Sequence, residues 1–176
     1  MKRTIRYEQN YCYLTELVAA DLPFIKQWRN EQMAVLRQTK VLTDTDQKKW
    51  FRAMRKDTQQ NLFAIIDKKN TALIGYGGLT HIDWVHQRAE ISFLLATNIS
   101  KARYRQLFLE ALAMFRDHAF QHHKLHKVFT ETYPFRKYHI AILEEFGFKR
   151  DGQMTDHIFY KGKFIPSLLH YLLTTK

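Results

Sequence analysis

The chain has 176 residues, a length typical of one domain, and 45% of them are hydrophobic, which excludes a largely disordered protein. Lys and Arg number 28 against 17 Asp and Glu, and the formal net charge of +11 favours anionic partners such as phosphates and nucleotides. The single cysteine, Cys12, excludes an internal disulfide and a cysteine-based zinc site. The basic N-terminus has no apolar segment and no apolar run is long enough to span a bilayer, so we expect a soluble, cytoplasmic protein with one domain over residues 1–176.

The first third of the chain predicts one short strand followed by helices. Residues 11–16 have the character of a strand, and the sequence Asp-Leu-Pro at 21–23 marks the start of a helix. The apolar pattern of residues 33–36 predicts a second, shorter helix. Asp44 is the expected N-cap of the next helix, with Gln47 at its third position.

The middle of the chain predicts β structure. Residues 61–67 and 71–80 are typical of two strands joined by the turn at 68–70. Residues 88–96 form the clearest strand, in which Glu90, Ser92 and Leu94 share one face opposite a row of apolar side chains.

The last part of the chain returns to a mixed order. Residues 101–121 carry an apolar stripe at helical spacing, and a strand is expected at 127–132. A helix over 138–146 ends at Gly147, and two further strands flank the turn at 161–163. The order β-α-α-β-β-β-α-β-α-β-β favours an α+β architecture over a doubly wound parallel sheet.

Three segments of this sequence resemble the GCN5-related N-acetyltransferase (GNAT) superfamily: IGYGGLTHIDW at 74–84, RAEISFLLA at 88–96 and KVFTETYPFRKYHIAILEEFGFKRDG at 127–152. The stretch WRNEQMAVLR resembles one branch of it, the ribosomal-protein N-terminal acetyltransferases and sugar-nucleotide aminoacetylases. The resemblance implies the GNAT fold, a strongly twisted mixed sheet of about seven strands flanked by about four helices.

The resemblance also implies an activity. Members of the family transfer an acetyl group from acetyl-CoA, as co-substrate, to a primary amine by direct attack in a ternary complex. The branch and the net charge suggest a nucleotide-linked amino sugar or another small amine as acceptor. A protein N-terminus is the alternative acceptor, and a catalytically inactive GNAT-like binding module is the alternative to an enzyme.

Several residues match positions that bind the cofactor in the family. The backbone N–H groups of a four-residue stretch are expected to hold the thioester: Phe93, Leu94, Leu95 and Ala96. The pyrophosphate loop usually carries two glycines at the start of the long helix, but here Gln106 and Phe108 occupy these positions. Lys101, Arg103 and Arg105 could supply charge in place of backbone N–H groups, and Arg136 could reach a phosphate. The alternative is a solvated, basic start of the helix.

Glu90 is the candidate general base because it occupies the strand position where relatives place a catalytic glutamate; the alternative is a structural ion pair. His81 and Asp83 follow the preceding strand, where the substrate amine is expected, and either could take its proton. Tyr138 is the candidate acid for the thiolate, with Tyr133 as the other nearby tyrosine.

The remaining predictions concern the acceptor and other partners. Arg29 and Asn30 are expected to line the acceptor cleft together with Asp83, and Arg29 suits an anionic acceptor. A histidine cluster comprises His118, His122, His123 and His126, but no carboxylate completes a zinc motif, so the spacing favours a solvated helix end and no metal. No RNA-binding motif is present, so nucleic acid and membrane are not expected as partners. Members of the family are often dimers, and a homodimer is an assembly that the resemblance allows.

Overall fold

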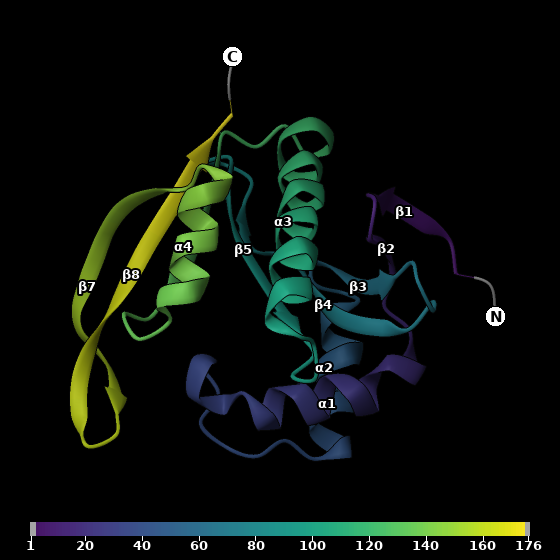
Figure 1. The fold of residues 1–176 in the computed structure, drawn as a ribbon, viewed down its shortest axis with the longest axis horizontal. Coiled ribbons are helices and arrows are strands. Elements are labelled where there is room, and N and C mark those ends of the chain that lie inside the picture. The colour runs from purple at the N-terminus through teal and green to yellow at the C-terminus, as the bar shows by residue number, and fades with distance from the viewer. Residues whose placement is uncertain (1–2, 175–176) are drawn as a thin grey trace.

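The computed structural model describes residues 3–174, and one eight-stranded sheet organises them (Figure 1). The strand order across the sheet is β1-β2-β3-β4-β5-β6-β8-β7. All neighbouring strands are antiparallel except β5 and β6, which are parallel. The strands are β1 (Ile5–Glu8), β2 (Cys12–Glu16), β3 (Asn61–Asp67), β4 (Leu73–Asp83), β5 (Arg88–Leu95), β6 (Lys127–Thr132), β7 (Lys149–Tyr160) and β8 (Lys163–Leu173).

Helices pack on the sheet in two groups. In Figure 1, α3 and α4 stand side by side in front of the sheet, and α1 and α2 cross below the lower end of α3. The helices are α1 (Leu22–Glu31), α2 (Asp44–Met54), α3 (Lys101–Asp117) and α4 (Lys137–Phe146), with short turns η1 (Ala19–Asp21), η2 (Met33–Val35) and η3 (His118–His122). No helix among residues 3–174 is both long and apolar enough to cross a membrane.

The alternation along β5 explains how one strand supports two cores. Ala89, Ile91 and Leu95 point into the main core, where they pack with the apolar stripe of α3. Leu94 points to the other face, where it packs with Trp28 of α1 in a smaller core. The α+β class and the faces predicted for this strand are therefore confirmed.

The structure refines two predictions about local structure and corrects a third. The mixed sheet matches the predicted fold and has β1 as an eighth strand, which pairs with β2 but is short, largely exposed and too weak in apolar pattern to be recognised. The long helix is α-helical to Asp117 and continues as the π-turn η3 to His122, close to the predicted end at residue 121. The N-cap of α2 is Thr43 rather than Asp44, since the Thr43 hydroxyl accepts from the N–H of Asp46 while the Asp46 carboxylate accepts from the N–H of Thr43.

The sheet opens at the point where β5 and β6 separate. The two strands pair only between residues 88–90 and 127–129, although β5 continues to Leu95 and β6 to Thr132. On its other edge β5 stays paired with β4 along its whole length. Gly77 of β4 permits this pairing, because a Cβ there would lie 2.0 Å from the Cβ of Phe93. The sheet thus splits into two arms, and we call the gap the β5–β6 opening.

Candidate active site

The β5–β6 opening contains a cavity of about 70 Å³ between the two arms. Strand β5 contributes its middle residues, 90–93, to the wall, and β6 contributes Thr130 and Glu131 from the opposite side. The remaining lining residues come from η2 and the loop after it and from the start of α4: Val35, Leu36, Arg37, Tyr133, Arg136 and His139. The cavity therefore joins four separate parts of the chain.

The edge of β5 that faces the opening carries free backbone groups. The N–H of Ala96 donates to the C=O of Ile74 in β4 at 2.8 Å. Because bonded pairs alternate along an antiparallel ladder, the N–H of Leu94 also points to β4, whereas those of Phe93 and Leu95 point to the opposite edge. The C=O of Leu95 on that edge accepts from the side chain of Gln32 at 2.9 Å. Of the four residues predicted to hold a thioester, two direct their N–H groups into the opening.

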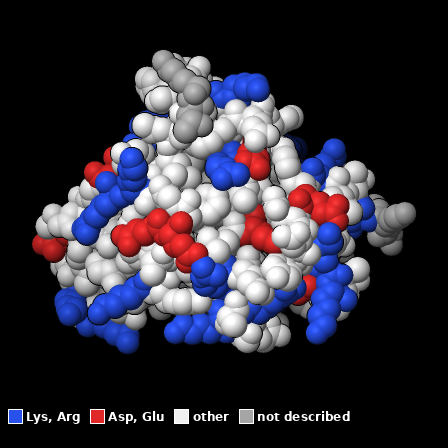
Figure 2. Space-filling view, turned by 45° about the horizontal axis from the view of Figure 1, so that its top comes forward, with Lys and Arg blue, Asp and Glu red and all other residues white. Residues whose placement is uncertain are grey.

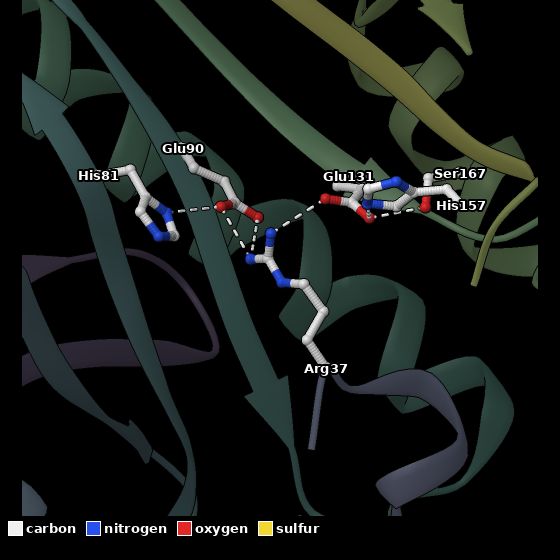
Figure 3. Close-up of polar contacts among 6 residues, drawn as sticks. All are labelled: Arg37, His81, Glu90, Glu131, His157 and Ser167. Carbon is white, nitrogen blue, oxygen red and sulfur yellow. Dashed lines mark hydrogen bonds and ion pairs between the residues drawn. The ribbon is translucent and has the colours of Figure 1, made fainter. Parts of the chain in front are cut away.

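Glu90 lies at the base of the opening and is 3% exposed (Figure 3). Both its carboxylate oxygens accept from Nη2 of Arg37, each at 2.9 Å. One of them also lies 2.9 Å from Nδ1 of His81. The buried negative charge is therefore compensated by a guanidinium and an imidazole, and not by Arg88, which pairs with Asp83.

His81 reaches this carboxylate because the end of β4 is irregular. The register of β4 shifts between Thr80 and Asp83, and His81 has a φ of 50°. An ionised carboxylate can only accept a hydrogen bond, so Nδ1 of His81 is the donor in this contact, and in the neutral form of the ring the lone pair lies on Nε2. The side chain of His81 remains 66% exposed, which leaves Nε2 accessible from solvent.

Arg37 bridges the two arms of the sheet. Its Nη1 donates to Glu131 of β6 at 3.0 Å, opposite the contacts that it makes with Glu90 of β5 (Figure 3). Ser167 of β8 donates to the other oxygen of Glu131 at 2.7 Å, and His157 lies 3.9 Å from that oxygen. Burial alone would lower the pKa of Arg37, but the carboxylates of Glu90 and Glu131 raise it overall. Arg37 lies in the loop after η2, where no periodic spacing marks it in the sequence as a site residue.

The N-termini of α3 and α4 meet beside the opening at a second cavity of about 450 Å³. Its charged lining side chains are the cations Lys101, Arg136 and Lys137. Arg136 and His139 line both this outer cavity and the β5–β6 opening, so the two cavities adjoin. Burial lowers the pKa of Arg136, whose guanidinium contacts Nδ1 of His139 at 3.0 Å. No ion pair between Arg136 and a carboxylate occurs among residues 3–174.

The N-terminus of α3 itself is a source of N–H groups. Ser100 is its N-cap, with the side chain accepting from the N–H of Arg103 at 3.4 Å. Helix geometry leaves the N–H groups of Lys101 and Ala102 without an intrahelical partner, whereas those of Gln106 and Phe108 belong to the helix ladder. Gln106 is exposed and Phe108 is buried in the main core, so the two positions usually held by glycine lie within the helix.

Other predicted cofactor residues on α3 and α4 are committed to contacts within the chain. Arg103 donates to Asp67 at 2.9 Å and lies over the ring of Tyr11. Arg105 pairs with Glu145 of α4. Tyr138 donates to the C=O of Lys101 at 3.1 Å, while Tyr133, 4% exposed, lines the opening.

The three residues predicted to line the acceptor cleft lie in different parts of the structure. Arg29 lines a cavity of about 190 Å³ on the other face of β5, next to Trp50 and Tyr76. Asn30 is held by the loop that follows, donating to the C=O of Leu42 at 3.0 Å and accepting from its N–H at 2.8 Å. Asp83 accepts from the N–H of His86 at 2.9 Å in the turn between β4 and β5. Of the three residues, Arg29 therefore lines a cavity, whereas Asn30 and Asp83 form hydrogen bonds that stabilise loops.

The match to a family model decides the identification. The model described as acetyltransferase (GNAT) domain covers residues 12–149. The chain belongs to this family. This acetyltransferase is also similar to the spermidine N(1)-acetyltransferase of Vibrio cholerae, at 26% identity over 68% of this chain and 67% of the relative. An uncharacterized N-acetyltransferase, p20, of Bacillus licheniformis is 26% identical over 90% of this chain and 89% of its own length.

Solved structures show the same fold. Spermidine N-acetyltransferase from Vibrio cholerae, in complex with CoA and spermine, superposes with a TM-score of 0.82 at 23% identity. The superposition covers 92% of this chain and 95% of the other. A dodecameric structure of that protein gives a TM-score of 0.77 at 22% identity, covering 92% and 93% of the two chains.

These comparisons confirm part of what the sequence predicted. The protein is an acetyl-CoA-dependent N-acetyltransferase, so the inactive binding module is not supported. One curated relative and the similar solved structures are named for spermidine, and none of those reported is named for ribosomal proteins or sugar nucleotides, which corrects the assignment to that branch.

Proposed function

We propose that the β5–β6 opening is the active site and that His81 is its general base. The observation that carries this proposal is the contact of 2.9 Å between Nδ1 of His81 and the buried carboxylate of Glu90. Both carboxylate oxygens are already occupied by Arg37 and one by His81, so Glu90 is placed to orient the imidazole. The sequence analysis gave the proton to Glu90 with help from His81, and the geometry favours the reverse division of roles.

The reaction would proceed in one ternary complex. Nε2 of His81 takes a proton from the ammonium group of the acceptor, and the neutral amine attacks the thioester carbonyl. The N–H group of Phe93, a residue that lines the opening on the free edge of β5, would stabilise the oxyanion that forms. Collapse of this intermediate breaks the C–S bond, and the nitrogen releases its second proton to solvent, which leaves the neutral acetylated amine and the CoA thiolate.

Tyr133 is better placed than Tyr138 to protonate this thiolate. Tyr133 lines the opening, whereas Tyr138 lines the outer cavity and donates to the C=O of Lys101. Burial raises the pKa of Tyr133, which keeps the phenol protonated at neutral pH.

The CoA pyrophosphate would bind at the outer cavity between the N-termini of α3 and α4. The free N–H groups of Lys101 and Ala102 and the cations Arg136 and Lys137 supply the donors and charge that a glycine-rich loop usually provides. Arg103, Arg105 and Gln106 would contribute little, because the two arginines are paired with carboxylates and Gln106 lies in the helix ladder.

We propose a small primary amine that also carries an anionic group, such as a nucleotide-linked amino sugar, as the acceptor. Arg29 lines the cavity of about 190 Å³ that includes Thr80, the residue before the proposed base, with Trp50 and Tyr76 available to pack on a ring. Figure 2 shows Lys and Arg side chains along the lower edge of the molecule, while Asp and Glu form smaller groups nearer the middle.

A polyamine such as spermidine is the second candidate. The carboxylates of Glu90 and Glu131 at the opening, together with the names of the relatives, favour it. Arg37 neutralises part of this negative charge, and the net charge of +11 opposes a polycation.

Release of CoA thiol should be measured with four acceptors at equal concentration: a nucleotide-linked amino sugar, the corresponding free amino sugar, spermidine and a peptide with a free N-terminus. We expect the nucleotide-linked sugar to give the highest kcat/KM, and Arg29→Gln to reduce that value but not the value for the free sugar. A higher kcat/KM for spermidine would assign this enzyme to polyamines, and a higher value for the peptide would assign it to protein N-termini.

A homodimer remains a prediction. Light scattering coupled to size exclusion would give the mass in solution, and a mass equal to one chain would contradict it.

A further inference from the structure

A second cluster of titratable side chains lies at the end of α3 far from the cofactor cavity. His118, His122 and His123 each offer one ring nitrogen, and these three atoms lie within 4.8 Å of one another. The π-turn creates this arrangement, because the N–H of His123 donates to the C=O of His118 at 3.1 Å, five residues back. The turn thus gathers three imidazoles, where helical spacing alone would bring His118 and His122 together.

The buried member of the cluster has a free nitrogen. His118 is 3% exposed, and its Nδ1 lies 2.7 Å from the hydroxyl of Tyr7 on β1. Its Nε2 is buried and has no hydrogen-bond partner within the described part of the chain. A buried nitrogen without a partner is costly, whereas a histidine whose second ring nitrogen is held by a neighbour is the usual form of a metal ligand.

Ions can reach this cluster from solvent. A cavity of about 610 Å³ is lined by His118 and His122 together with Tyr7, Glu16 and Asn61. Asn61 contacts the third imidazole, with its Nδ2 at 3.4 Å from Nε2 of His123. Of the two arginines that line this cavity, Arg6 is offset by an ion pair with Glu16, and Arg55 lies over the ring of Phe51.

We propose that His118, His122 and His123 bind one divalent transition metal ion, with Zn²⁺ as the ion that this ligand set suits best. Three neutral imidazoles favour Zn²⁺, Ni²⁺ or Cu²⁺ over Mg²⁺, Ca²⁺ or Mn²⁺, which prefer oxygen ligands. A water molecule would complete a tetrahedral shell. The site lies on the face of the sheet covered by α3, separate from Glu90 and His81, and acetyl transfer does not require it. Its effect would be to fasten the end of α3 to β1 through Tyr7.

The test uses the full chain without an affinity tag, stripped with a chelator. Zn²⁺ is titrated by calorimetry, and Co²⁺ is added separately because its visible absorption reports tetrahedral coordination. His122→Gln removes the exposed ligand and is expected to leave the fold intact, with His126→Gln as the matched control on an exposed histidine outside the cluster. Tyr7→Phe removes only the partner of Nδ1.

We expect one Zn²⁺ per chain, an intense Co²⁺ spectrum and a rise in Tm on adding Zn²⁺. His122→Gln and His123→Gln should each abolish the rise in Tm, His126→Gln should keep it, and Tyr7→Phe should weaken binding by about 10- to 100-fold. The absence of stoichiometric binding, or equal binding by the His122 and His126 variants, would overturn the proposal. Binding with an octahedral, weakly absorbing Co²⁺ spectrum would also overturn the tetrahedral three-histidine site.

Discussion

The two sides of the β5–β6 opening handle charge in opposite ways. On the proposed acceptor side, Arg37 is shared between Glu90 and Glu131, and each buried carboxylate has a cationic partner. On the proposed cofactor side, Arg136 lines the adjoining cavity beside Lys101 and has no carboxylate partner among the described residues. Paired charges fix the position of a reactive group, whereas unpaired cations keep their donors available for a phosphate that arrives with the substrate.

The largest effect is expected on the acceptor side, from changing the proposed general base or the carboxylate that orients it. His81→Asn and Glu90→Gln should each lower kcat by about 100-fold or more, because the first removes the proton acceptor and the second removes the group that orients it. The affinity for acetyl-CoA, measured by calorimetry, should stay within about twofold since neither residue lies in the cofactor cavity. An unchanged kcat for His81→Asn with a large loss for Glu90→Gln would return the role of base to Glu90.

On the cofactor side, Arg136→Gln tests the unpaired cation. We expect the Kd for acetyl-CoA to rise by about 10- to 100-fold, the usual range for a lost hydrogen bond to a charged group. Binding should also become less dependent on salt, because one of the charges that attract the phosphates is gone. An unchanged Kd would place the pyrophosphate outside this cavity.

Removing Arg37 should have an intermediate effect on turnover. Arg37→Gln leaves Glu90 buried with only His81 as partner and releases the contact with Glu131. We expect kcat to fall by about tenfold because the imidazole is held less firmly. We also expect the acid limb of the pH profile of kcat to shift. Arg52→Gln, an exposed change on α2 where the guanidinium contacts only the C=O of Lys48, is the control and should leave both unchanged.

The pH dependence of the free energy of unfolding, measured without substrate, tests the buried histidines, among them His139 of the outer cavity. Burial, with a contribution from Arg136, holds the pKa of His139 well below its ordinary value, and burial lowers the pKa of His170 as well. The unfolded chain takes up protons on these histidines near pH 6.5 and the folded chain does not, so stability is complete above that pH and falls as the pH decreases. We expect a loss of up to about 1.4 kcal/mol per pH unit for each histidine in urea unfolding at pH 7 and pH 5. His139→Gln should reduce this slope, and His86→Gln, an exposed change, should not.

The smallest effect is expected for the paired arginines of α3. Arg103→Gln and Arg105→Gln should each change the Kd for acetyl-CoA by less than about twofold, because these guanidiniums already bind Asp67 and Glu145. If either change raised the Kd for acetyl-CoA as much as Arg136→Gln does, an ion pair with a carboxylate would not prevent an arginine from binding the phosphates.

How far the sequence could predict this molecule depends on the range of the interactions involved. Strands β3 and β6 were placed at their observed bounds, and Gly147 was identified as the residue that ends α4 in a left-handed conformation with a φ of 109°. These features follow from period, turn chemistry and the freedom of glycine, all of which are local. Glu90 and His81 were also singled out before their contact was known.

What the sequence by itself determined is therefore the α+β architecture, the family and a short set of candidate side chains. Only the tertiary structure decided which of them work together. Arg37 meets Glu90 across 53 residues and Glu131 across 94, and no local pattern encodes such a pairing. The same holds for Arg103 and Arg105, whose charge suggested a phosphate site until Asp67 and Glu145 were found beside them. Charge is a property of the residue, but whether that charge is free to bind a substrate depends on the neighbours that folding brings to it.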